Sequence, residues 1–269
     1  MNFSHYPEQE PFNENMVAYH DYLIDRAKGL KPIEVTYGND PYQSMAIFPA
    51  ENADGRVVLF FHGGGWTNGY KEWMYFIAPA LTARGITFVS AGYRLAPQHV
   101  FPEGFADCQA ALQWLAKNIS NYGGDPEKIF VSGHSAGGHY AALLAVKPPE
   151  GIPAIKGCAP VSGIYYFGDG AGMAVRPRFL GPPEANAEEA ASPINFVRKG
   201  LPRFLLSYGS DDFPHLVRQA GEMQQALEAE SVSVQTLKLP NCNHFTASYA
   251  VGDIDGLWAQ TFDAWSKSA

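Results

Sequence analysis

The stretch KIFVSGHSAGGH, residues 128–139, decides the fold of this chain. Its Ile-Phe-Val run is short and apolar, which is typical of a buried strand, and residues 140–146 after it predict a helix. Between the two lies GHSAG, residues 133–137, which matches the pattern G-x-S-x-G. In that pattern a serine stands on a sharp turn from strand to helix, and the glycines leave room for the neighbouring backbone. Ser135 is therefore the candidate nucleophile.

Strand-like and helix-like segments alternate on both sides of this stretch. Apolar runs at 57–61 and 87–90 predict inner strands that are covered on both faces, and a helical period follows over 105–119. Downstream, the same alternation predicts strands at 204–208 and 232–239, a helix at 216–228, and a C-terminal helix that holds Leu257, Trp258, Phe262 and Trp265. This order predicts an α/β protein with a mostly parallel, doubly wound sheet.

Two further segments depart from that alternation. Residues 33–37 and 43–48 flank a Gly-Asn-Asp-Pro turn, which predicts an antiparallel hairpin ahead of the parallel sheet. The segment 164–192 is rich in Gly, Pro and Ala. We expect it to form a small cap or lid over the site, and a plain surface loop is the alternative. Because no linker or repeat divides the chain, we expect one domain over residues 1–269.

Composition and charge exclude several classes of partner. The formal charge of -8 and the pI near 5.4 leave no surplus of Lys and Arg for nucleic acid or for an anionic membrane. Residues 1–16 have neither a basic start nor an apolar core, and no apolar run approaches the ~20 residues of a membrane span, so we expect a soluble, cytoplasmic protein. The three cysteines are widely spaced and no histidine cluster has metal spacing, so we expect no disulfide, no metal and no cofactor.

A second glycine-rich stretch, HGGGW at residues 62–66, follows the predicted strand at 57–61. Glycines at such a place let backbone N–H groups approach a substrate without an intervening side chain. Acyl transfer needs fixed donors where the tetrahedral oxyanion develops, and the loss of one donor typically costs about 3 kcal/mol. We predict that the N–H groups of Gly64, Gly65 and Ala136 form this oxyanion hole.

A serine nucleophile needs a histidine to accept its proton and a carboxylate to orient that histidine. On a strand-turn-helix serine of this kind, the acid and then the histidine follow the serine in the chain. Asp212 and His244 each come directly after a predicted strand, at the carboxyl end where open α/β sheets bind ligands. Spacing alone does not distinguish Asp212 from the adjacent Asp211.

These motifs together resemble the kynurenine formamidase (arylformamidase) branch of the α/β hydrolases and the neighbouring hormone-sensitive-lipase-like carboxylesterases. The similarity covers most of the chain and runs through HGGGW (62–66), GYRLAP (92–97), YGGDP (122–126), GHSAGGH (133–139) and NHF (243–245). The segment GSDDFPHLVRQ, residues 209–219, is similar to the part of the family pattern that holds the catalytic acid, and this places the acid on Asp212. The resemblance implies the α/β-hydrolase fold.

The leading hypothesis is a serine hydrolase that cleaves a small carboxylic ester or activated amide through an acyl-enzyme. An arylformamidase acting on N-formyl aryl amides such as N-formylkynurenine is the alternative, and a ligand-binding relative without catalysis is a remote one. We rank the esterase first because this chain has His215 and Thr246 where formamidases usually carry acidic residues. Four residues that flank the motifs are candidate substrate contacts: Trp66, His134, Tyr165 and Phe245.

Overall fold

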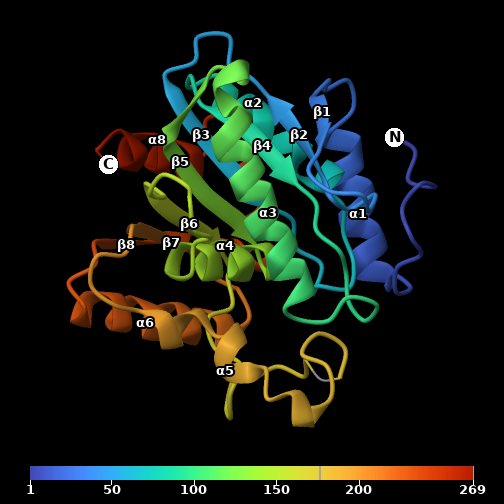
Figure 1. The fold of residues 1–269 in the computed structure, drawn as a ribbon, viewed down its shortest axis with the longest axis vertical. Helices are drawn as coiled ribbons and strands as arrows, with labels where there is room; N and C mark the ends of the chain where they lie inside the picture. Colours follow the sequence, from blue (N-terminus) through green and yellow to red (C-terminus); the bar gives the residue numbers. More distant parts are fainter. Residues whose placement is uncertain (176, 269) are drawn as a thin grey trace.

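A single eight-stranded sheet organises the molecule, which is described by a computed structural model over residues 1–175 and 177–268 (Figure 1). The strand order is β1-β2-β4-β3-β5-β6-β7-β8. The bounds of the strands are β1 (Ile33–Thr36), β2 (Ser44–Phe48), β3 (Gly55–Phe61), β4 (Thr87–Ala91), β5 (Gly124–His134), β6 (Gly157–Val161), β7 (Arg203–Gly209) and β8 (Val234–Leu239). All neighbours from β4 to β8 pair in parallel, which confirms the predicted fold class.

The predicted hairpin is also confirmed. β1 pairs with β2 in antiparallel register, with Ile33 opposite Ile47 and Thr36 opposite Ser44. β2 then pairs with β4 in antiparallel register, so the hairpin extends one edge of the parallel sheet.

Helices cover both faces of the sheet because its strands are apolar on both faces. In β3, Val57, Leu59 and Phe61 pack into one hydrophobic core, and Val58 and Phe60 pack into the other. The first core is closed by α3 (Glu103–Asn118), α4 (Ala136–Val146) and α6 (Pro214–Ala229). The second is closed by α1 (Glu14–Arg26), η1 (Lys71–Ile77), α2 (Ala78–Thr82), α7 (His244–Val251) and α8 (Leu257–Lys267).

Several elements were not predicted from the sequence, among them α1, β6 and α7. The signal for α1 was Asn13, whose side chain accepts a hydrogen bond from the Met16 N–H and caps the helix. For α7 it was Asn243, which forms a capping box with Thr246. β6 contains Gly157 and Pro160, residues that are rare in strands, yet it is fully buried between β5 and β7.

Residues 164–192 leave the sheet after β6 and form an excursion that ends in η3 (Pro183–Ala185) and α5 (Glu188–Ala191). Figure 1 shows this segment, in yellow and gold, extending away from the sheet. Buried Gln219 of α6 holds its start, because the side-chain oxygen accepts the N–H groups of Tyr165 and Tyr166 and the side-chain nitrogen donates to the Ala171 carbonyl. Arg176, inside this predicted lid, and Ala269, the last residue of the predicted domain, lie outside the described residues.

Two short 3-10 helices connect larger elements. η4 (Pro193–Phe196) leads from the excursion back to β7, and η2 (Ile119–Tyr122) joins α3 to β5. Within residues 1–175 and 177–268, none of the helices combines the length and the apolar character that crossing a membrane requires.

Candidate active site

Ser135 lies on the turn between the end of β5 and the start of α4. Its backbone has φ 55° and ψ -118°, a conformation that non-glycine residues rarely adopt. Two residues on, a Cβ added to Gly137 would clash with the carbonyl oxygen of Phe61 at the end of β3. The glycine therefore allows α4 to start directly against the sheet, and the turn holds the Ser135 side chain at the carboxyl ends of the strands.

Three side chains from distant parts of the chain meet at this turn. The Ser135 Oγ lies 3.0 Å from His244 Nε2, and His244 Nδ1 lies 2.9 Å from Asp212 Oδ1. Because an ionised carboxylate can only accept, His244 carries its proton on Nδ1 and presents the lone pair of Nε2 to the serine hydroxyl. The structure therefore brings together the three residues that the sequence singled out, in an arrangement that can withdraw a proton from Ser135.

Asp212 is buried and held by several donors. Its Oδ2 accepts a 2.5 Å hydrogen bond from the Ser162 hydroxyl, and its Oδ1 accepts the Phe213 N–H at 2.8 Å. Burial by itself would raise the pKa of Asp212, but the hydrogen bond and the electrostatic attraction of His244 and the hydrogen bond from Ser162 outweigh it and lower this pKa to about 2. Asp212 is thus ionised at any pH near neutrality. Ser162, which has φ 51°, was not identified from the sequence.

The neighbouring carboxylate, Asp211, points elsewhere. Its side chain is exposed and its Oδ2 lies 3.2 Å from the Ser210 hydroxyl. The turn after β7 therefore directs Asp212 toward His244 and Asp211 toward solvent, a distinction that sequence spacing could not make.

His244 is the first residue of α7, and its backbone is fixed by His134. The His134 Nε2 lies 2.9 Å from the His244 carbonyl oxygen, to which it donates, and its Nδ1 faces the Tyr19 hydroxyl at 3.5 Å. Burial and the nearby His244 lower the pKa of His134 to about 3, so its ring is neutral. His134 was predicted as a substrate contact, and the structure instead places it in the protein interior behind the histidine.

The glycine-rich loop lies beside Ser135. Gly64 has φ 118° and Gly65 has φ 63°, conformations that favour glycine, and a Cβ on Gly64 would clash with the Asn68 carbonyl. Within the described residues, the N–H groups of Gly64 and Gly65 donate to no other group of the protein. Ala136 is the first residue of α4, where helix N–H groups lack intrahelical partners. These amides are available as donors, and the preceding Gly63 lies against Ser135, because a Cβ added to it would come within 3.3 Å of the Ser135 Cβ.

Buried His139 joins this loop to the segment 164–192. Its Nδ1 accepts the indole N–H of Trp66 at 3.1 Å, and its Nε2 donates to the Ala191 carbonyl at 2.7 Å. The pair of bonds requires a neutral ring, and burial lowers the pKa of His139 to about 3. His139 thereby fixes Trp66, which has φ 65°, at the end of the loop.

We expect His139 to make the protein less stable in acid. Its folded pKa of about 3 lies below the ordinary 6.5, so the unfolded chain binds the proton first and stability falls as the pH drops below 6.5 toward 3. From about pH 6 to about pH 4 this single group should remove about 1.4 kcal/mol of unfolding free energy per pH unit. Urea unfolding of the wild type and of His139→Gln measures it: the stability advantage of the wild type should shrink as the pH falls, and a constant difference would contradict the assignment.

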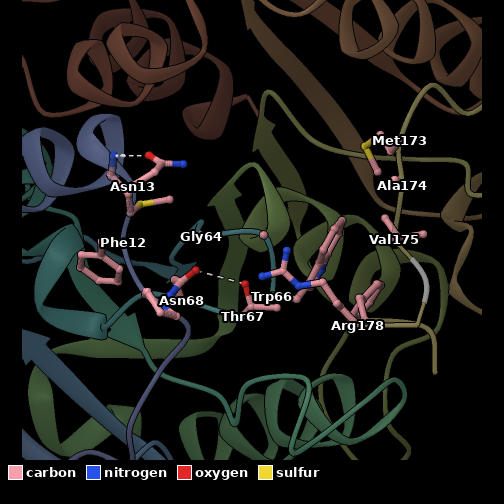
Figure 2. Close-up of a pocket in the computed structure, with 14 residues that line it drawn as sticks. Phe12, Asn13, Gly64, Trp66, Thr67, Asn68, Met173, Ala174, Val175 and Arg178 are labelled. Carbon is pink, nitrogen blue, oxygen red and sulfur yellow. Dashed lines mark hydrogen bonds between the residues drawn. The ribbon is translucent and has the colours of Figure 1, made fainter.

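A cavity of about 440 Å³ opens beside the glycine-rich loop (Figure 2). Three parts of the chain line it: residues 11–13 with Met16, residues 64–68, and residues 173–175 with 178–179. The N-terminal wall was not predicted from the sequence. The lining of the cavity is about equally polar and apolar, and it includes Gly64 and Gly65, whose amides are predicted to hold the oxyanion.

The four predicted substrate contacts lie in different surroundings. Trp66 lines the cavity and stacks on Phe179 with ring centroids 4.1 Å apart. Tyr165 is buried beneath the start of the excursion, and Phe245 is half-buried against Tyr19. Neither they nor His134 line this cavity, and among the described residues no group of three or more His, Cys, Asp and Glu side chains is placed to hold a metal.

Comparison with known proteins gives consistent matches. A family model described as alpha/beta hydrolase fold matches residues 58–173. Esterase LipC of Mycobacterium tuberculosis is 32% identical over 78% of this chain and 58% of LipC, and Esterase LipQ of the same organism is 30% identical over 70% of this chain and 49% of LipQ. This chain thus spans about half the length of these two relatives. A hyperthermophilic esterase from the archaeon Pyrobaculum calidifontis shares the fold, with a TM-score of 0.78 and 21% identity over 94% of this chain and 92% of that chain.

Proposed function

Because this chain belongs to the alpha/beta hydrolase superfamily, we propose that it is a serine hydrolase that cleaves small carboxylic esters. The observation that carries the proposal is the line of hydrogen bonds from Asp212 through His244 to Ser135. The names of LipC and LipQ, both esterases, favour an ester over an amide as the substrate.

In the proposed reaction the Ser135 oxygen attacks the ester carbonyl carbon while His244 Nε2 takes the hydroxyl proton. His244 then gives this proton to the leaving alkoxide, and an acyl-enzyme remains on Ser135. Water repeats the two steps and releases the acid. Asp212 keeps the Nδ1 proton in place and balances the imidazolium, while the amides of Gly64, Gly65 and Ala136 hold the oxyanion.

Kinetics on two substrate classes test the proposal. We expect the purified protein to hydrolyse p-nitrophenyl esters of short acids and to react covalently with a fluorophosphonate probe. Faster turnover of N-formylkynurenine at equal enzyme would instead favour the arylformamidase alternative, which uses the same groups. A protein that neither turns over an ester nor takes up the probe would be a ligand-binding relative without catalysis.

We propose that residues 164–192 act as a lid within one domain. Support for the lid comes from residues 173–175, which form one wall of the cavity, and from His139, which ties Ala191 to the glycine-rich loop. The cytoplasmic location expected from the sequence stays a prediction.

Ser162 is a positioning residue in this proposal, because its hydroxyl holds the carboxylate that orients His244. We expect Ser162→Ala to lower kcat by about 10- to 100-fold, the range for a hydrogen bond to a charged group, with KM little changed. Ser162→Gly also removes the hydroxyl but suits the φ of 51°. If the hydroxyl matters, both variants lose kcat; full activity of the glycine variant would show that only backbone strain was involved.

A further inference from the structure

The cavity beside the glycine-rich loop has one charged side chain among its described lining residues, and that side chain is Arg178. The other described walls are apolar or neutral, including Phe12, Met16, Val175 and Phe179. Figure 2 shows the Arg178 side chain reaching from the 173–179 segment past Trp66 toward Thr67. Among the described residues of this lining, Arg178 is therefore the group that would attract an anion, and its own acidic partner competes with that anion.

That partner is Glu10, which holds only part of the guanidinium. Glu10 accepts from Nε of Arg178 at 3.1 Å and forms an ion pair with Nη2. Within the described part of the chain, Nη1 has no hydrogen-bond partner, so two of the five N–H donors remain on that nitrogen alone. The Arg178 side chain is 54% exposed, which leaves it accessible to a ligand.

The acidic partner itself is anchored to the glycine-rich loop. The Glu10 carbonyl accepts the side-chain N–H of Asn68 at 2.7 Å, and the preceding Gln9 bonds both the N–H and the carbonyl of Gly69. These bonds hold Glu10, and through it Arg178, at a fixed place relative to Gly64 and Gly65. A guanidinium held this way can recognise an anionic group at a set distance from the reacting carbonyl.

Resting on the esterase function proposed above, we propose that the cavity takes esters that carry a carboxylate away from the reacting carbonyl, and that Arg178 binds this carboxylate. Glu10 then has two effects: it orients the guanidinium, and its negative charge competes with the substrate. The formal charge of -8 on the whole chain opposes anionic substrates at long range, so their recognition has to come from this local contact.

Matched pairs of esters test the proposal. Mono-p-nitrophenyl adipate and p-nitrophenyl hexanoate differ by a carboxylate on the acyl part, and p-acetoxybenzoate and p-tolyl acetate differ by one on the alcohol part. The measured quantity is kcat/KM for the anionic ester divided by kcat/KM for its neutral partner. In Arg178→Gln we expect this ratio to fall about tenfold for the pair whose carboxylate lies in the cavity. The same ratio should rise in Glu10→Gln, which keeps an acceptor for Arg178 but removes the charge.

Two further variants make the result specific. Lys117→Gln removes a positive charge from the exposed end of α3 and should leave both ratios unchanged. Arg178→Lys keeps the charge and should retain more of the preference, which separates recognition from a folding defect. Equal changes for both members of each pair in Arg178→Gln, or no change, would overturn the proposal. Absence of turnover of the neutral esters by the wild type would instead overturn the esterase function itself.

Discussion

Ser135→Ala is expected to lower kcat for a p-nitrophenyl ester by about five to six orders of magnitude, the loss typical of removing a serine nucleophile. The only hydrogen-bond partner of the Ser135 hydroxyl among the described residues is His244, so the substitution leaves the remaining contacts of the site in place. Steady-state hydrolysis and labelling by a fluorophosphonate probe measure the two consequences, and both signals should vanish together.

The control for this variant is Ser120→Ala, which changes an exposed serine in η2. It should keep wild-type turnover and probe labelling. Substantial ester hydrolysis by Ser135→Ala, at a level that the Ser120→Ala preparation also shows, would refute the assignment of Ser135 as the nucleophile. Unchanged circular dichroism in both variants would show that the difference lies in the chemistry.

Asp212→Asn is expected to lower kcat by about four orders of magnitude. An asparagine amide can donate to His244 Nδ1, which places the ring proton on Nε2 and removes the lone pair that faces Ser135. The chain supplies a matched control in Asp211→Asn, which alters the adjacent, exposed carboxylate and should retain wild-type kcat.

This pair of variants distinguishes orientation of the histidine from a general loss of negative charge, because each variant removes one carboxylate at neighbouring positions. Comparable losses in both would mean that local charge matters and that the 2.9 Å contact between Asp212 and His244 does not. A pH series adds a second readout: since the pKa of Asp212 is lowered to about 2, no loss of wild-type activity between neutral pH and about pH 4 should come from protonation of this residue.

The sequence could predict the strand-turn-helix at Ser135 because the chemistry and the local backbone constrain the same few residues. Gly137 is needed for the close approach of α4 to β3, and this requirement is visible in the sequence as a pattern. The order of acid and histidine after parallel strands is likewise a property of topology, so Asp212 and His244 could be named before their contact was seen.

Features that depend on long-range packing could not be read in the same way. Phe12 lies in the cavity wall because the segment around it packs against η1, far along the chain, and no local pattern reports this. Ser162 follows β6, which was not predicted because Gly157 and Pro160 are unusual in strands. Its position between β5 and β7 nevertheless stabilises the strand conformation. His134, adjacent to the nucleophile in sequence, points into the interior because successive residues of a strand face opposite sides.

Two serines with left-handed backbone conformations end neighbouring strands of the sheet, and this has a consequence for how the protein withstands heat. His134 of β5 is in register with Val161 of β6, so Ser135 and Ser162 continue side by side, and their N–H groups bond to Val161 and Ser207. Each such conformation typically costs about 1 to 3 kcal/mol and persists only while its surroundings enforce it. The backbone conformation of the two serines is therefore a property of the central strands, and separation of β5 from β6 would abolish it at once.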